Sequence, residues 1–464
     1  MIHPVTQPVT QPMPAQATAH AHCDILIIGA GPAGMAAAMA AAPSGASITL
    51  VDDNPQPGGQ IWRDGPQVAL PALAQQHRAA LARHTNIRLL PGTRVVGAGD
   101  PHPGDKAPAL LLEDADRGWT QHSHRIVLCT GARELLLPFP GWTLPGVTGA
   151  GALQALIKAG LDVRGQRIVI AGTGPLLLAA AATATHAGAT VLRVAEQAPW
   201  TALAGFAAQL PRWPAKALQA LTLLNTGLRA STHVLEAQGA ARVQSVRLRK
   251  GAHAEETIAC DRVACGFGLV PNTELGQLLG CALGGPLSKG LGLEVDAHMR
   301  TSVANVYAAG ECTGFGGSER ALAQGAMAGH AAAGQAQQAE ALRPQLARWE
   351  AFAQVLQSSF VLNEQIKSLP HPDTLVCRCE DVAYAALAPR QGWIDAKLHT
   401  RCGMGACQGR ICGAATQHLL GWVPAPPRHL LAPARIGTLA AQGPAAPGAA
   451  HPADGTAAQP AQRP

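Results

Sequence analysis

The sequence predicts an α/β protein of three parts, because one glycine-rich pattern occurs twice and five of the 11 cysteines gather near the C-terminus. Each copy of the pattern has the order strand, Gly-rich turn, helix and strand, which predicts two Rossmann-like dinucleotide-binding domains. The cysteines predict a small, α-rich third domain that holds a metal centre. With 464 residues and a hydrophobic content of 47%, the chain can form several globular domains.

Composition and charge exclude two classes of function. The net charge is +6, and no run of Lys and Arg is interleaved with aromatic residues, so nucleic-acid binding is not expected. The uncharged stretches 25–51 and 168–192 are long enough to cross a bilayer, which takes ~20 residues. Glycines divide each stretch into strand, turn and helix, so no integral membrane segment is expected.

The first 22 residues are interpreted as a disordered leader, because they are rich in Pro, Gln and Thr. They lack a basic start and an apolar segment, so they do not resemble a signal peptide. Their histidines (His3, His20 and His22) are interpreted as solvated rather than as metal ligands. We therefore expect a cytoplasmic protein, in which clustered cysteines stay reduced and favour a metal site over disulfides.

The first copy of the pattern, "CDILIIGAGPAGMAAAMAAAPSGASITLVDD" (23–53), is complete. Gly29 permits the tight turn, Gly31 lets the backbone approach a pyrophosphate, and Gly34 lets the helix pack closely on the strand. The helix that follows faces the phosphates with its free N–H groups, and Pro32 and Ala33 are expected among the cofactor-binding residues. Asp52 ends the second strand and can accept a hydrogen bond from an adenosine ribose hydroxyl, with Asp53 as the alternative.

The second copy, "RIVIAGTGPLLLAAAATATHAGATVLRVAEQ" (167–197), is imperfect. Gly172 and Gly174 are present, but Leu177 replaces the third glycine and should separate helix from strand or shift the helix. Glu196 ends the second strand and would suit an unphosphorylated ribose. Two readings stay open: a site for NAD or for an adenine nucleotide such as ATP or ADP, or a domain that kept its fold and lost its ligand.

Three further motifs surround the second copy: "PGGQIW" (57–62) with Gly59 and Gln60, the segment Thr130-Gly131-Ala132, and Gly310-Glu311 after an "AA" strand end. With these motifs the chain resembles the two-dinucleotide-domain flavoenzymes of the glutathione and thioredoxin reductase superfamily. The resemblance implies that the first glycine loop holds the FAD pyrophosphate and that residues 130–132 lie near the adenine half. It also implies that Glu311, where Asp is commoner, binds the ribityl and phosphate end.

The redox cysteine pair of the disulfide reductases is missing from this chain. "GGQIWRDG" contains no cysteine, and the cysteines of the second domain form no CxxC. Scattered cysteines in apolar strands are usually small core residues. A thiol–disulfide relay is therefore not expected, and a reduced flavin needs another route for its electrons.

The C-terminal cysteines occur in "VCRCED" (376–381) and "RCGMGACQGRICG" (401–413). Two pairs of thiolates hold zinc or an iron–sulfur cluster, and CxC followed by CxxxxC is unusual for zinc. Neighbouring glycines let backbone N–H groups approach bridging sulfides, which favours [2Fe–2S] over zinc or inert thiols. Spacing alone does not decide whether Cys402 is a ligand together with Cys407 or is not a ligand.

The segment resembles the [2Fe–2S] domain of the bacterioferritin-associated ferredoxin type. In particular it resembles the version that follows an FAD/NAD(P) module in the subunits of octopine and nopaline oxidase, hydrogen cyanide synthase and D-hydroxyproline dehydrogenase. The resemblance covers roughly residues 23–440. It implies the cluster ligands Cys377, Cys379, Cys407 and Cys412, with Cys402 as a bystander.

The resemblance implies an FAD- and [2Fe–2S]-containing subunit of a hetero-oligomeric amine or imino-acid dehydrogenase of the opine, glycine or D-hydroxyproline type. Its partners would be a D-amino-acid-oxidase-like FAD subunit, which binds the substrate, and a small ferredoxin-like subunit. No residue of this chain is expected to act as a catalytic acid or base, because His298, His330 and His371 are isolated in sequence. The alternatives are a self-contained NAD(P)H-dependent ferredoxin or acceptor reductase, and a non-enzymatic nucleotide-binding assembly subunit with structural zinc.

The expected domains follow from these motifs. They are a leader (1–22), a discontinuous FAD-binding domain (23–150 and 295–335), a second nucleotide-binding domain (151–294), a helical connector (336–372), a [2Fe–2S] domain (373–440) and a disordered Pro/Ala-rich tail (441–464).

Overall fold

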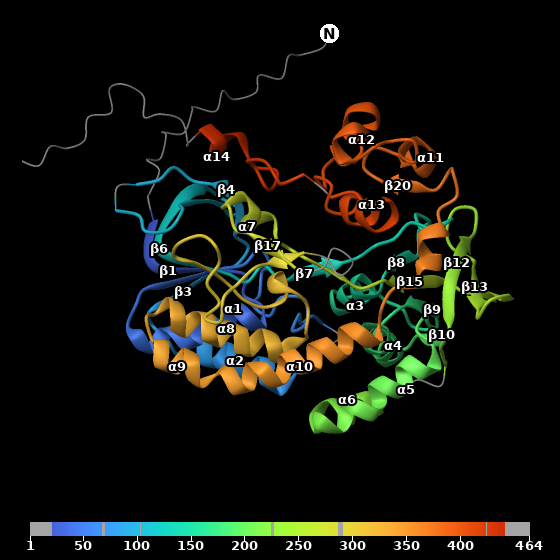
Figure 1. The fold of residues 1–464 in the computed structure, drawn as a ribbon, viewed down its shortest axis with the longest axis horizontal. Coiled ribbons are helices and arrows are strands. Elements are labelled where there is room, and N and C mark those ends of the chain that lie inside the picture. The colour runs from blue at the N-terminus through green and yellow to red at the C-terminus, as the bar shows by residue number, and fades with distance from the viewer. Residues whose placement is uncertain are drawn as a thin grey trace, which may run out of the picture.

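The computed structural model describes residues 21–66, 70–102, 104–223, 227–285, 291–423 and 425–440 (Figure 1). The predicted tail and all but the last two residues of the predicted leader lie outside these described residues. Within them, no helix is long and apolar enough to cross a membrane. The first strand begins at Ala21, two residues before the predicted start of the first domain.

A seven-stranded sheet forms the first domain. Its strands, in spatial order, are β3 (Ile87–Leu90), β2 (Ile48–Val51), β1 (Ala21–Ile28), β6 (Gly118–Leu128), β5 (Leu110–Glu113) and β4 (Arg94–Ala98), with β19 (Val306–Ala308) paired to β6. β1, β2, β3, β6 and β19 run parallel, whereas β4 and β5 form an antiparallel meander with β6. The central parallel strands β1 and β2 are largely buried apolar runs, as expected of a sheet covered on both faces.

Two helices with small side chains pack against each other below this sheet. They are α1 (Pro32–Ala41) and α8 (Ser318–Ala332), which lie next to α2 (Ala72–Leu81) in Figure 1. A Cβ on Gly325 would lie 2.1 Å from the carbonyl oxygen of Ala33, and one on Gly329 would lie 2.2 Å from that of Ala37. The two backbones therefore touch at successive turns, which explains how a chain with 3% aromatics builds a dense core.

The second domain contains a parallel sheet and an antiparallel one. The parallel sheet has the order β11 (Leu228–Arg229), β10 (Thr190–Glu196), β9 (Arg167–Gly172), β15 (Arg262–Gly266) and β8 (Val147–Gly149). The antiparallel sheet consists of β12 (Thr232–Gln238), β13 (Ser245–Lys250) and β14 (Ala254–Ala259). The helices are α3 (Ala150–Lys158), α4 (Leu176–His186), α5 (Trp200–Gln209) and α6 (Pro214–Thr222), with the 3-10 turn η2 (Leu210–Arg212).

The chain crosses between the two domains on a pair of short antiparallel strands, β7 (Ala132–Glu134) and β16 (Leu269–Pro271). Both crossings lie before the predicted boundaries of the second domain, 151 and 294. At the first crossing, β8 already belongs to the sheet of the second domain. At the second crossing, Leu275 already shares a core with β1 of the first domain. The returning segment contains α7 (Glu274–Leu278), β17 (Leu283–Gly284), β18 (Gly292–Leu293) and the 3-10 turn η4 (Glu311–Thr313).

The connector is helical, as predicted, with α9 (Ala336–Ala341), α10 (Arg343–Ser359) and the 3-10 turn η5 (Glu364–Ser368). The cysteine domain follows with β20 (Leu375–Cys377), β21 (Val382–Ala383), α11 (Tyr384–Leu387), α12 (Trp393–Thr400) and α13 (Cys412–Leu420). Its core residues Val376 and Trp393 form one cluster with Val234 of the second domain. The cysteine domain is therefore anchored to the second domain through a shared core.

A C-terminal strap, residues 429–440, returns to the first domain and ends in α14 (Ile436–Ala440), as Figure 1 shows. The amide of Leu431 donates to the carbonyl of Val96 on β4 at 2.8 Å. Glu113 on β5 is 1% exposed and accepts hydrogen bonds from the Arg435 amide at 2.8 Å and from the Thr438 hydroxyl at 2.7 Å. The cysteine domain is thus tethered to both larger domains.

Candidate cofactor sites

The three glycines of the first loop have the distinct environments that the sequence predicted. Gly29 has φ +102, and a Cβ there would lie 2.2 Å from the carbonyl oxygen of Cys129. A Cβ on Gly34 would lie 1.7 Å from the carbonyl oxygen of Gly29, because α1 packs directly on the turn. Gly31 has only the Cα of Gly59 within 4 Å of its Cβ position, so its open side is available to a ligand.

Asp52 holds the glycine loop in place. Its Oδ2 accepts a hydrogen bond from the Ala30 amide at 2.5 Å, and its Oδ1 accepts from the amide and side chain of Asn54, each at 2.8 Å. The carboxylate therefore ties the turn after β1 to the turn after β2. Asp53, the alternative ribose acceptor, lines the same cavity, and burial together with the charge of Asp52 raises the pKa of its carboxyl.

One cavity of about 2070 Å³ runs between the two larger domains. Its lining includes the first-domain residues predicted to bind the cofactor, namely Gly29, Gly31, Pro32, Ala33, Asp52, Asp53, Gly59, Gln60, Thr130, Gly131, Ala132 and Glu311. Gly34 and Gly310 lie behind the lining and set the close packing around it. The volume exceeds the ~300–1,000 Å³ of a typical small-molecule site, so an extended ligand such as FAD fits.

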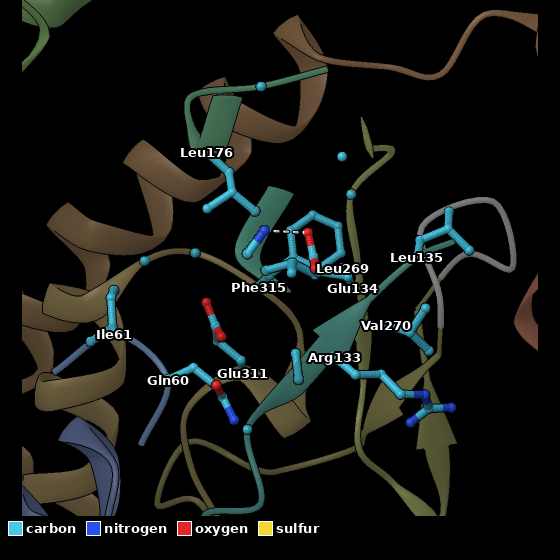
Figure 2. A pocket seen from close by; sticks show the side chains of 18 of the residues that line it. Gln60, Ile61, Arg133, Glu134, Leu135, Leu176, Leu269, Val270, Glu311 and Phe315 are labelled. Carbon is cyan, nitrogen blue, oxygen red and sulfur yellow. Dashed lines mark hydrogen bonds between the residues drawn. The ribbon is translucent and has the colours of Figure 1, made fainter. Parts of the chain in front are cut away.

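Figure 2 shows the side chains of Gln60 and Glu311 projecting into this cavity from the first domain, and Leu176 projecting into it from the second. Burial raises the pKa of Glu311, and the charge of Arg320 offsets part of that effect. Glu134 lies on β7, and its carboxylate reaches the N-terminus of α3. There it accepts hydrogen bonds from the amides of Gly151 at 2.6 Å and Ala152 at 2.9 Å. Glu134 is therefore a helix cap rather than a free base.

The second glycine loop differs from the first in two ways. α1 begins directly after Gly31, whereas α4 begins two residues after Gly174, so the helix is shifted as Leu177 predicted. Leu177 is buried in the core beneath α4. Glu196 repeats the role of Asp52, since it is 3% exposed and accepts from the amides of Gly174 at 2.7 Å and Ala198 at 2.9 Å. Burial raises the pKa of Glu196.

A segment that the sequence did not implicate covers the second loop. The ring of Phe360, at the end of α10, lies 4.0 Å from the position of a Cβ on Gly174. Gln197 holds the following residues, because it donates to the carbonyl of Val361 at 3.2 Å and accepts from the Asn363 amide at 3.0 Å. Of the predicted second-site residues, Gly174 and Glu196 line the cavity, whereas Gly172 packs against β15.

The five C-terminal cysteines come together in the fold. The thiols of Cys377, Cys402 and Cys412 lie within 4.8 Å of one another and are buried. Hydrogen bonds from Cys402, Cys412 and the Gly403 amide lower the pKa of Cys377 to about 2. Three buried thiols at this spacing are donors of the kind that zinc or iron requires.

The remaining two thiols extend this group toward the surface. Cys407 forms hydrogen bonds with Cys412 and with the exposed Cys379. The hydrogen bond with Cys412 is the main cause that lowers the pKa of Cys407 to about 5. A Cβ on Gly405 would lie 2.3 Å from that of Cys379, and Gly403 and Gly409 pack against Trp393. The four predicted ligands thus form one chain of contacts, and Cys402 lies beside Cys377 and Cys412. The choice between the two ligand sets stays a prediction.

Arg133, which the sequence analysis did not select, links this motif to the cavity. It follows Ala132 on β7, lines the cavity and donates from Nε to the carbonyl of Arg410 at 3.0 Å. Arg410 lies between Cys407 and Cys412. No sequence signal identifies this contact, because the two residues are 277 positions apart.

Comparison with known proteins places these sites in context. The family model of pyridine nucleotide-disulphide oxidoreductases matches residues 23–336. An opine oxidase subunit of Rhizobium meliloti (strain 1021) is 32% identical over 427 residues, which cover 84% of this chain and 90% of that protein. Hydrogen cyanide synthase subunit HcnB of Pseudomonas aeruginosa is 31% identical over 446 residues, which cover 86% of this chain and 94% of HcnB.

Solved structures show the same fold at lower identity. L-proline dehydrogenase from P. horikoshii has a TM-score of 0.61 at 16% identity and covers 90% of this chain and 80% of its own. Thioredoxin reductase from T. acidophilum has a TM-score of 0.51 at 22% identity and covers 68% and 99%. The fold of the two nucleotide-binding domains is therefore the disulfide-reductase-like α/β fold.

Proposed function

We propose a function for this chain from one premise: it belongs to the pyridine nucleotide-disulphide oxidoreductase family and is an FAD-dependent oxidoreductase. The proposed function is that of the electron-transfer subunit of a cytoplasmic, heteromeric amine or imino-acid dehydrogenase. In this proposal the chain carries FAD and a [2Fe–2S] cluster. It passes electrons between a partner flavoprotein and an acceptor. The observation that carries the proposal is the five-cysteine group beside the strand that lines the FAD cavity.

The lining of the cavity supports the absence of a thiol–disulfide relay. Among the described residues that line it, Cys129 is the one cysteine, and burial raises the pKa of its thiol well above the ordinary value. The Cys312 thiol acts on Cys129, but burial raises the pKa of both thiols, and thiols that stay protonated react poorly in a relay. In this proposal, electrons from a flavin in this cavity leave through the C-terminal cysteines.

The residues present fit both groups. Gly31 and the start of α1 would hold the FAD pyrophosphate, Asp52 or Asp53 would meet the ribose, and Glu311 would meet the ribityl and phosphate end. Cys377, Cys379, Cys407 and Cys412 would hold the cluster. When bound, FAD exchanges electrons in pairs or singly and the cluster exchanges them singly, so this chain would supply position, electrostatics and exclusion of water.

The partner in this proposal binds the amine. The opine oxidase relative and HcnB both carry the name of a subunit, and by analogy this chain would assemble with a D-amino-acid-oxidase-like FAD protein and a small ferredoxin-like protein as a hetero-oligomer. The cavity of this chain supports that division of labour. Two of the carboxylates that line it, Glu134 and Glu196, are engaged by backbone amides, which makes these two poor bases for C–N oxidation.

The experiment compares two electron donors under anaerobic conditions. The chain is purified alone and together with its flavoprotein partner, and NADH or a panel of opines and imino acids is added while the visible spectrum is followed. We expect bleaching of flavin and cluster bands only with the complex and an amine. Rapid bleaching of the isolated chain by NADH would instead establish a self-contained NAD(P)H-dependent ferredoxin or acceptor reductase.

One observation favours that second function: the cavity continues from the first glycine loop to Gly174 and Glu196 of the second. An NAD, ATP or ADP molecule there would have to share the space next to Gly174 with Phe360. Zinc without iron, or a chain without flavin, would support the third reading, a nucleotide-binding assembly subunit.

A further inference from the structure

Arg133 contacts three parts of the molecule at once. Its Nε donates to the carbonyl of Arg410 at 3.0 Å, and its Nη1 donates to Oδ1 of Asn272 at 2.8 Å. The same Nη1 forms an ion pair with Glu274 at 2.8 Å, and each partner is 22% exposed. In Figure 2 the side chain points away from the centre of the cavity, so it serves the neighbouring cysteine domain rather than a ligand in the cavity.

The contacts around Arg133 form a continuous link from the cavity to the cysteine motif. Asn272 donates from Nδ2 to the carbonyl of Thr130 at 2.9 Å, and the Thr130 hydroxyl donates to the carbonyl of Asn272 at 2.6 Å. Thr130 lines the FAD cavity, and Arg410 follows Cys407 by three residues. Arg410 also donates from its guanidinium to the carbonyl of Leu431 in the C-terminal strap.

On this basis we propose that Arg133 is a positioning residue that docks the 407–412 loop onto the flavin strand and, with Glu274, sets the reduction potential of the cluster held there. The proposal rests on the proposed function, because it requires a cluster at the cysteines. It goes further by assigning a role to two residues outside the cysteine and glycine motifs.

The charge part of the proposal follows from burial. A guanidinium and a carboxylate that are both largely shielded from water act on neighbours through a lower dielectric than surface charges do. Arg133 reaches the cysteine motif directly, because its Nε donates to the carbonyl of Arg410, three residues after Cys407. Reduction adds a negative charge to a cluster, so a nearby cation favours the reduced form and a nearby anion disfavours it.

The two members of the pair therefore have opposite predicted effects. Arg133→Gln removes the cation and leaves Glu274 unpaired, so the cluster becomes harder to reduce. The equilibrium constant for reduction should fall about tenfold, which lowers the potential by ~59 mV for one electron. Glu274→Gln leaves the cation unopposed and makes the cluster easier to reduce by about the same factor. Loosening of the structure alone would move both variants in the same direction.

The docking part is tested by a third variant and a second readout. Arg133→Lys keeps the charge but cannot donate to both Arg410 and Glu274 in the same geometry. We expect the reduction potential of this variant to stay within ~28 mV of the parent. At ~59 mV per factor of ten, this is about a threefold change in the equilibrium constant for reduction. In iron-free protein, hydrogen exchange at 407–412 should be faster in both Arg133 variants than in the parent.

The measurement is an anaerobic redox titration of the complete chain followed by electron paramagnetic resonance, with hydrogen exchange on the iron-free form. Arg164→Gln is the matched control, because it removes one cation from an exposed ion pair with Asp162 in the second domain. Opposite shifts for Arg133→Gln and Glu274→Gln, with the control unchanged, support the proposal. Equal potentials in all loaded variants, or shifts of the same sign, overturn it. A chain without iron overturns the proposed function itself, whatever the hydrogen exchange shows.

Discussion

Gly31 and Gly34 belong to one motif but are required for different reasons. A Cβ on Gly34 would meet the carbonyl of Gly29 at 1.7 Å, which is a conflict within the protein. A Cβ on Gly31 meets only Gly59, at 3.9 Å, and would project toward a bound pyrophosphate. We therefore predict that Gly34 is required for folding and that Gly31 is required for cofactor binding.

This difference is measurable. Gly34→Ala should lower the free energy of unfolding by about 2 kcal/mol or more, since overpacking against backbone forces α1 away from β1. Gly31→Ala should leave the unfolding of the FAD-free protein within ~1 kcal/mol but weaken FAD binding at least tenfold. Urea denaturation and flavin fluorescence titration give both quantities. Gly205→Ala, where nothing lies within 4 Å, is the control. Equal losses of stability in the two loop variants would contradict this account.

Cys402 is the test of the predicted ligand set. It is 0% exposed and lies beside Cys377 and Cys412, so its position does not by itself exclude it as a ligand. We expect Cys402→Ala to retain iron and to lose only ~1 kcal/mol of stability, as for a small buried side chain. Cys412→Ala should lose iron. Iron and sulfide assays on both purified variants decide, and the reverse pattern would assign Cys402 to the cluster in place of Cys412.

Residues in local motifs were predictable, whereas residues that act across the fold were not. The roles of Gly29, Gly31 and Gly34 follow from spacing, because strand, turn and helix are adjacent in the chain. The ribose role of Asp52 stays a prediction. The structure shows that its carboxylate ties Ala30 to Asn54, which spacing does not reveal. Arg133 and Phe360 meet partners more than 180 residues away, so no local pattern indicates them.

At the scale of elements, the repeated pattern predicted both nucleotide-binding units and the shift of the second helix. The order β3-β2-β1 with α1 follows from one motif, and β11-β10-β9 with α4 from the other. The C-terminal strap was not predicted, because residues 429–440 were assigned to the [2Fe–2S] domain and their sequence, HLLAPARIGTLA, carries no signal for docking on a distant strand. Its docking depends on a buried carboxylate in a strand more than 300 residues earlier.

The strap should be released by acid. Burial of Glu113 acts to raise the pKa of its carboxyl, but hydrogen bonds from Thr438 and Arg435 outweigh it and lower the pKa. Its contribution is therefore complete above the unfolded pKa of about 4.3 and is lost as pH falls through the lower folded value. Protection factors from hydrogen exchange at 435–440, corrected for the intrinsic exchange rate at each pH from 7 to 3, measure this.

Glu113→Gln provides the comparison for the strap. It should remove ~1.5–3 kcal/mol of docking free energy at neutral pH, the contribution of a charged hydrogen bond. The protection factors of its strap amides, which are corrected for the intrinsic pH dependence of exchange, should then vary little between pH 5 and pH 3. Loss of protection in the parent already between pH 7 and pH 5 would show that another group controls the strap.

At the scale of the whole molecule, two nucleotide-binding domains enclose the cavity and the cysteine domain bridges them. The shared core around Trp393 fixes the cysteine domain to the second domain, and the strap fixes it to the first. Arg133 on the crossing strand β7 then brings the cysteine motif to the wall of the cavity. In the proposed function, this arrangement would let electrons pass between a flavin in the cavity and the cysteine motif.

The central claim is that the five-cysteine group holds a [2Fe–2S] cluster that serves the flavin. The most direct test is to purify the chain anaerobically, measure FAD, iron and acid-labile sulfide, and record the electron paramagnetic resonance spectrum after reduction. The account predicts iron and sulfide in equal amounts, each twice the amount of FAD, with the signal of a reduced [2Fe–2S] cluster. Zinc in place of iron, or flavin with neither iron nor sulfide, would contradict it.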